Sequence, residues 1–139
     1  MYFNPHLQPN GVGGMIVTFE EVPEAIAEGA TLEAALANAV DALELALLGY
    51  MKDGLALPVA PSKSAANVVY VTAPVAAKLA FYEAFRNSGL SKSALARKLG
   101  KDEAEVRRML DPHHATKLGA LDDALRALGK RLSIVVEDA

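Results

Sequence analysis

Basic side chains gather in one stretch of the chain, where they could bind the phosphates of a nucleic acid. Residues 86–108 contain seven Lys and Arg against three Asp and Glu, a local charge of +4. Ammonium and guanidinium groups bind phosphate oxygens, and the guanidinium group also reads base edges. The stretch therefore predicts a basic surface that binds phosphate groups.

The same stretch, "LSKSALARKLGKDEAEVRRML" from Leu90 to Leu110, has the pattern of two short helices joined by a glycine turn. Such a pair needs a small residue where the helices cross and a residue tolerant of positive φ in the turn, and Ala96 and Gly100 fit these roles. The pattern is similar to helix-turn-helix units of the Xre/Cro type, and a plain helical hairpin in a core is the alternative. The expected buried contacts come from Leu95, Leu99, Val106 and Met109.

In a DNA-reading unit of this kind, the second helix enters the major groove by its N-terminal end. Asp102 and Glu105 have the spacing of a capping box. Glu103 could accept a hydrogen bond from cytosine, or it could only stabilise the first turn of the helix. The predicted DNA-binding residues are Ser91, Lys92, Lys101, Glu103, Glu105, Arg107, Arg108, Thr116 and Lys117.

The histidines offer a second kind of chemistry. His113 and His114 are adjacent, and neighbouring side chains usually point apart, with no third metal ligand close in sequence. A loop or capping role is therefore expected, with no metal, no cofactor and no catalytic residue. His6 stands alone in the sequence.

Charge divides the chain into two parts. Residues 1–77 hold two bases and eight acids, a charge of −6, whereas residues 78–139 hold twelve bases and nine acids, a charge of +3. The total of −3 over 139 residues hides this asymmetry, which indicates two partners of opposite charge, although ordinary variation between domains could also produce it. The chain has no cysteine, so no disulfide or thiolate site is expected.

The first part of the chain predicts a small α+β domain over residues 1–72. Strands are expected at Tyr2–Leu7, Met15–Phe19 and Val68–Val71, with a glycine-rich turn between the first two. Thr31 suits the N-cap of a long helix that ends near Asp53, and residues 58–67 suit a linker. Asp41 and Glu44 interrupt the apolar helix, and no signal peptide is evident, so a soluble cytoplasmic protein without membrane spans is expected.

Residues 73–139 predict an all-α domain that ends in a short strand. Helices are expected from Pro74 to Asn87, in the two halves of the opening stretch, and from Leu118 to Leu128. The apolar run Leu132–Val136 predicts a terminal strand, which requires a partner strand. Pairing with a second copy of the chain would supply one, and the expected dimerisation residues are Leu132, Ile134 and Val136.

Over almost its full length the chain resembles HicB antitoxins of the subgroup with an Xre-like helix-turn-helix. The resemblance rests on "MIVTFEEVPEAIAEGATLEAALANAVDALELAL", "PVAPS", "VVYVTAPVAAKLAFYEAF", "LARKLG" and "HHATKLGALDDALRALGK", in this order. It implies a partial RNase H-like first domain that binds a basic HicA ribonuclease toxin. It also implies a second domain that binds operator DNA, and assembly into dimers or tetramers. The expected toxin-contact residues are Phe19, Glu20, Glu21, Glu24 and Glu28, each of which could instead be an ordinary surface position.

Two alternatives stay open at this point. An RNase H-like enzyme needs carboxylates that converge on a metal, and the predicted strands contain no Asp or Glu, so catalysis is not expected. The other alternative is a stand-alone transcriptional regulator whose first domain senses a ligand or a protein. Gly11, Gly13 and Gly14 precede a strand rather than a helix, which argues against a phosphate-cradling loop.

Overall fold

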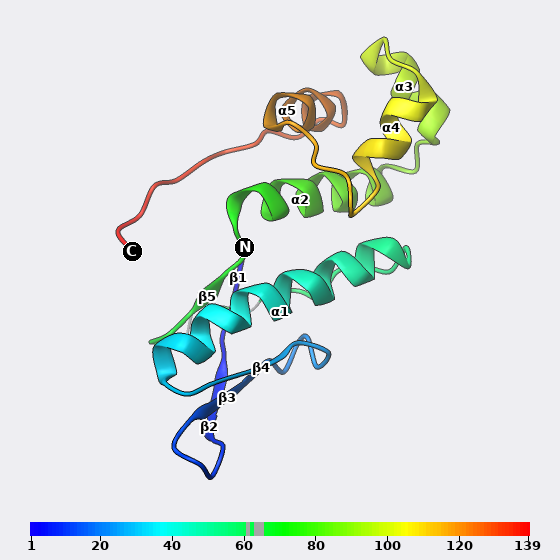
Figure 1. The fold of residues 1–139 in the computed structure, drawn as a ribbon. Coiled ribbons are helices and arrows are strands. Elements are labelled where there is room, and N and C mark those ends of the chain that lie inside the picture. Colours follow the sequence, from blue (N-terminus) through cyan, green and yellow to red (C-terminus); the bar gives the residue numbers. More distant parts are fainter. Residues whose placement is uncertain (61, 63–65) are drawn as a thin grey trace. The chain divides into compact units, whose positions relative to one another are not determined.

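The computed structural model describes residues 1–60, 62 and 66–139, and it confirms the α+β class (Figure 1). The chain forms two compact units, Met1–Ala76 and Ala77–Ala139. The expected linker over residues 58–67 lies partly outside the described residues, as does the base Lys63.

The first unit contains two small antiparallel sheets. β2 (His6–Pro9), β3 (Met15–Thr18) and β4 (Ile26–Gly29) form one sheet in that order. β1 (Tyr2–Phe3) pairs with β5 (Val69–Tyr70) in the other. The strand expected over Tyr2–Leu7 is therefore divided at Asn4-Pro5, because proline lacks the N–H group that a ladder requires. The two halves join different sheets.

β4 is a strand that the sequence analysis did not predict. Its segment is rich in Ala, Glu and Gly, which have low strand propensity. Packing explains the strand: a Cβ atom added to Gly29 would lie only 2.3 Å from the backbone nitrogen of Ala35 on the following helix. Small residues at Ala27 and Gly29 therefore let helix and strand backbones approach closely.

The long helix α1 (Leu32–Lys52) begins and packs as its sequence dictates. The Thr31 side chain caps its N-terminus by accepting a hydrogen bond from the Ala34 N–H at 3.1 Å, as expected. By length and composition α1 could cross a membrane. It nevertheless packs against β3 and β4 like the core helix of a globular unit. The buried stripe consists of Ala35, Ala39, Leu43, Leu47 and Met51.

The second unit is helical. Its elements are α2 (Ala73–Ser88), which starts at the end of the first unit, α3 (Lys92–Leu99), α4 (Glu103–Met109) and α5 (Leu118–Ala127). α3 contacts both α4 and α5. The fully buried side chains at the centre of the core are Phe81, Leu95, Val106 and Leu121.

The C-terminal strand expected over Leu132–Val136 is not present in the structure. Leu132 packs against the helical core, and the residues after it form neither helix nor strand. A strand exists only when its backbone pairs with a neighbour. The described part of this single chain pairs no strand with residues 132–136, so the segment stays irregular and strand pairing with a second copy stays a prediction.

Candidate functional site

The α3–α4 pair is held by a cap at one end and a glycine at the turn. The Ser91 hydroxyl accepts a hydrogen bond from the Ala94 N–H at 3.0 Å, which starts α3. Gly100 ends α3 with φ at +64°, a conformation that favours glycine. Ala96 is buried where the helices pack, so the roles predicted for Ala96 and Gly100 are confirmed. Lys92 is exposed at the start of α3.

The arginines of α4 are exposed, and each is paired with an acid of the same helix. Arg107 lies 3.1 Å from Glu103, with 56% and 44% of the two side chains exposed. Arg108 lies 2.5 Å from Glu105. These acids therefore restrain the two guanidinium groups on the surface of α4. Lys101, in the turn before α4, is also exposed.

The predicted capping box at the start of α4 is wrong. Asp102 occupies the N-cap position, but its side chain makes no capping hydrogen bond. The carboxylate of Glu105, which would have reached back to the cap, is bound by Arg108 instead. Glu103 also accepts a hydrogen bond from the Ser93 hydroxyl at 3.0 Å, so it links α4 to α3.

The loop before α5 is held by a buried lysine that the sequence analysis missed. Lys78 on α2 is only 6% exposed, and its ammonium group donates to the carbonyl of His114 and, at 3.2 Å, to the Thr116 hydroxyl. Burial lowers the pKa of Lys78, and the charge of Asp111 partly offsets this effect. Thr116 therefore already accepts a hydrogen bond within the fold, whereas Lys117 is exposed.

The two adjacent histidines belong to this loop. The His113 N–H donates to the Asp111 carboxylate at 2.9 Å, and the His114 N–H donates to the Asp111 carbonyl at 3.1 Å. Both contacts close a turn. Within residues 1–60, 62 and 66–139, no group of three or more His, Asp or Glu is arranged to hold a metal ion.

The predicted toxin-contact residues lie at different depths in the first unit. Phe19 is 2% exposed and belongs to the core, so its side chain is not available to a partner. Glu20, Glu24 and Glu28 are exposed, and Glu21 is half-buried. The Tyr50 hydroxyl lies 2.8 Å and 2.9 Å from the two carboxylate oxygens of Glu24, and this hydrogen bond raises the pKa of Tyr50.

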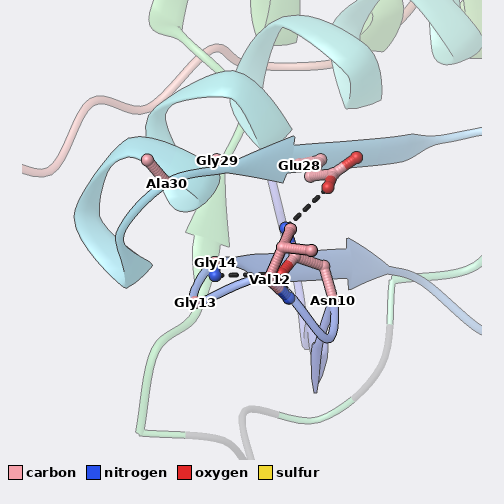
Figure 2. Close-up of a pocket in the computed structure, with 7 residues that line it drawn as sticks. All are labelled: Asn10, Val12, Gly13, Gly14, Glu28, Gly29 and Ala30. Carbon is pink, nitrogen blue, oxygen red and sulfur yellow. Dashed lines mark hydrogen bonds between the residues drawn. The ribbon is translucent and has the colours of Figure 1, made fainter.

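Glu28 borders a shallow hollow of about 500 Å³ at the end of the larger sheet (Figure 2). The Asn10 side-chain amide donates to the Glu28 carboxylate at 2.7 Å, while its carbonyl accepts from the N–H groups of Val12 and Gly14 at 2.9 Å. One asparagine thus shapes the β2–β3 turn and fixes an exposed carboxylate. The other lining residues are Gly13, Gly29 and Ala30.

Comparison with known proteins identifies the family. No protein-family model matches the chain. The antitoxin HicB of Escherichia coli K12 is 38% identical over 131 residues, which cover 94% of this chain and 95% of that protein. Antitoxin HicB 1 of Photorhabdus laumondii is 35% identical over 94% of this chain and 84% of its own length. Antitoxin HicB of Pseudomonas fluorescens is 37% identical over 91% of this chain and 88% of its own length.

The chain belongs to the HicB antitoxin family. The resemblance to HicB antitoxins noted in the sequence is thereby confirmed, because the similarity extends over nearly the whole length of the chain and of its relatives, whereas the subgroup with a helix-turn-helix stays a prediction. As a HicB antitoxin, the protein is one member of a toxin–antitoxin pair. The relatives' names place it among regulatory proteins rather than enzymes.

Proposed function

We propose that this HicB antitoxin neutralises a HicA-type ribonuclease toxin with its first unit and represses its own operon by binding operator DNA through α3 and α4. The observation that carries the proposal is the opposite charge of the two units. Met1–Ala76 contains two bases and eight acids, and Ala77–Ala139 contains twelve bases and nine acids. A basic toxin and anionic DNA are the matching partners.

The DNA-binding part of the proposal is supported by the geometry of α3 and α4. The two helices are joined through Gly100, and Lys101, Arg107 and Arg108 are exposed in the turn and on the second helix. A recognition helix enters the major groove by its N-terminal end, where Lys101 lies, whereas Arg107 and Arg108 lie in the last turn of this seven-residue helix. Ser91 and Lys92 at the start of α3 are proposed phosphate contacts. Lys117 is a third proposed phosphate contact, and it follows the loop that Lys78 holds in place.

The toxin-binding part is supported by the exposed carboxylates Glu20, Glu24 and Glu28. Glu24 and Glu28 are already fixed by hydrogen bonds to Tyr50 and Asn10. A fixed carboxylate loses little conformational entropy when it binds a cation of the partner. Masking a toxin requires no chemical step, so the proposed antitoxin has no catalytic residue and no cofactor.

Assembly of the antitoxin is proposed to occur through its terminal segment, in a cytoplasmic protein. Ile134 is 69% exposed and Val136 is 93% exposed, while Leu132 is anchored on the helical core. Pairing of Leu132–Val136 with a second copy would cover both segments, and it would align two α4 helices on a palindromic operator.

Co-expression with a candidate HicA-type toxin tests the proposal. We expect a stable complex, and we expect the antitoxin to bind its upstream DNA specifically in a gel-shift assay. A protein that binds this DNA but forms no complex would instead be a stand-alone regulator with a sensing domain. A protein that binds neither would refute both parts of the proposal.

A further inference from the structure

The β2–β3–β4 sheet has one face against α1 and an opposite face that is open to solvent. Val17 and Ala27 are paired across β3 and β4 and are buried on the side of α1. Successive residues of a strand point to opposite faces, so the residues between them point away from α1. Ile26 is 62% exposed. We call Ile16, Thr18, Ile26 and Glu28 the outer sheet face.

The outer sheet face combines an apolar pair with polar neighbours. The register places Thr18 opposite Ile26 and Ile16 opposite Glu28, so the two isoleucines are diagonal neighbours on one face. The hollow of Figure 2 adjoins Glu28 and brings in Val12, which is 86% exposed. Exposed apolar side chains beside charged ones are typical of protein–protein contacts.

Charge around the outer sheet face selects the kind of partner. Glu28 lies on this face, and Glu20 is exposed just after β3. The whole first unit carries eight acids and two bases, of which Lys52 lies in the last turn of α1. This field attracts a protein rich in Lys and Arg and repels an acidic one.

Strand addition at β4 is the less favoured way to use this sheet. The Asn38 side-chain amide on α1 donates to the Glu28 carbonyl at 2.8 Å, so a backbone acceptor of this edge strand is already occupied. An incoming strand needs free backbone groups along the edge. Side-chain contacts on the face are therefore favoured over backbone pairing at the β4 edge.

We propose that the outer sheet face is the surface on which the basic toxin docks, with Ile16 and Ile26 as its apolar contacts and Glu28 as an ion-pairing group beside them. This inference rests on the proposed function, since it assigns a surface to the toxin. It adds Ile16 and Ile26 to the acidic residues named from the sequence. Their side chains would supply the contact area from which water is excluded.

Ile26→Arg tests the proposal because it places a positive charge where a basic partner would dock. Leu45→Arg is the matched control, since Leu45 is 72% exposed on α1 and lies outside the outer sheet face. Toxin separated from the co-purified complex is immobilised, and the full-length antitoxin variants are passed over it. We expect Ile26→Arg to weaken toxin binding by roughly tenfold or more and Leu45→Arg by less than about twofold. Thermal unfolding and operator binding should be unchanged in both variants.

The outcomes separate this inference from the proposed function. If wild-type antitoxin binds toxin and Ile26→Arg binds it equally well, the outer sheet face is not the docking surface, although the antitoxin function stands. If wild-type antitoxin does not bind toxin, the proposed function fails and the inference fails with it. If Ile26→Arg keeps toxin affinity but lowers the antitoxin's mass in light scattering, the face binds a second copy of the chain, which also overturns the inference. Ile26→Ala, which adds no charge, serves as a second variant should the arginine impair folding.

Discussion

Arg107→Ala is the most direct perturbation of the proposed DNA surface. In the free protein Arg107 pairs with Glu103, four residues away at 3.1 Å, and about half of each side chain is exposed. An exposed pair of this kind contributes about 0.3–0.5 kcal/mol, so the substitution should change the free energy of unfolding by no more than about that amount. A bidentate arginine–base contact contributes about 1–3 kcal/mol to discrimination. We therefore expect operator affinity to fall by about 5- to 150-fold with little loss of stability.

The assay is fluorescence anisotropy with a labelled operator fragment and an unrelated fragment of equal length, each at several salt concentrations. A base contact predicts loss of preference for the operator, whereas a phosphate contact predicts uniform weakening and a salt slope that is shallower by about one. Arg126→Ala is the matched control, because Arg126 forms a similar exposed pair with Asp122 at 3.2 Å on α5. Equal effects of the two substitutions, or no effect of Arg107→Ala on operator binding, would refute the proposed recognition surface.

Glu103→Gln extends the same reasoning and distinguishes the two roles considered for this acid. Removing the carboxylate releases Arg107 and takes a negative charge away from the surface proposed to face phosphates. We expect operator affinity to rise by about twofold, which corresponds to the pair's 0.3–0.5 kcal/mol. A loss of affinity confined to operators with a particular cytosine would instead show that Glu103 reads a base.

Three further predictions concern packing, a buried charge and assembly. Gly29→Ala should destabilise the first unit by about 1–3 kcal/mol in urea unfolding, because the new methyl group would lie 2.3 Å from the Ala35 nitrogen, whereas Gly49→Ala, with open space around it on α1, should be neutral or stabilising. Burial lowers the pKa of Lys78 from its ordinary value of 10.5, so between the lowered value and 10.5 the unfolded chain binds more protons and the wild type gains stability as pH rises. When the two proteins are unfolded side by side at several pH values, Lys78→Met should lack this gain in stability at alkaline pH. An equal change of stability with pH in wild type and variant would contradict the prediction. Deletion of Leu132–Ala139 should reduce the antitoxin's mass in light scattering, and an unchanged mass would reject strand pairing as the means of assembly.

Much of the helical part of the fold could be predicted because its signals are local. Thr31 at the start of α1 and Gly100 at the end of α3 are residues whose chemistry acts within a few positions. Periodic apolar residues then define the buried faces, such as Ala35, Ala39 and Leu43 on α1.

The parts that could not be predicted depend on distant contacts. β4 follows from the close approach of Gly29 to Ala35 rather than from strand propensity. Residues 24–28 do alternate in burial, but the exposed residue Ile26 breaks the alternation of apolar and polar types in the sequence. From the sequence alone, Lys78 would be expected on the surface. Its ammonium group is bound by a loop that lies 36 residues later in the chain, which the local sequence does not indicate. Glu105 lost its expected capping role because Arg108 competes for the same carboxylate.

Inhibition of RNA cleavage is the measurement that tests the central claim most directly. A purified candidate HicA-type toxin is mixed with an RNA substrate and titrated with this antitoxin, with an unrelated acidic protein of similar size as control. The account predicts that cleavage stops near equimolar antitoxin and continues in the control. Cleavage that persists with excess folded antitoxin would contradict the claim that this protein neutralises its partner by binding it.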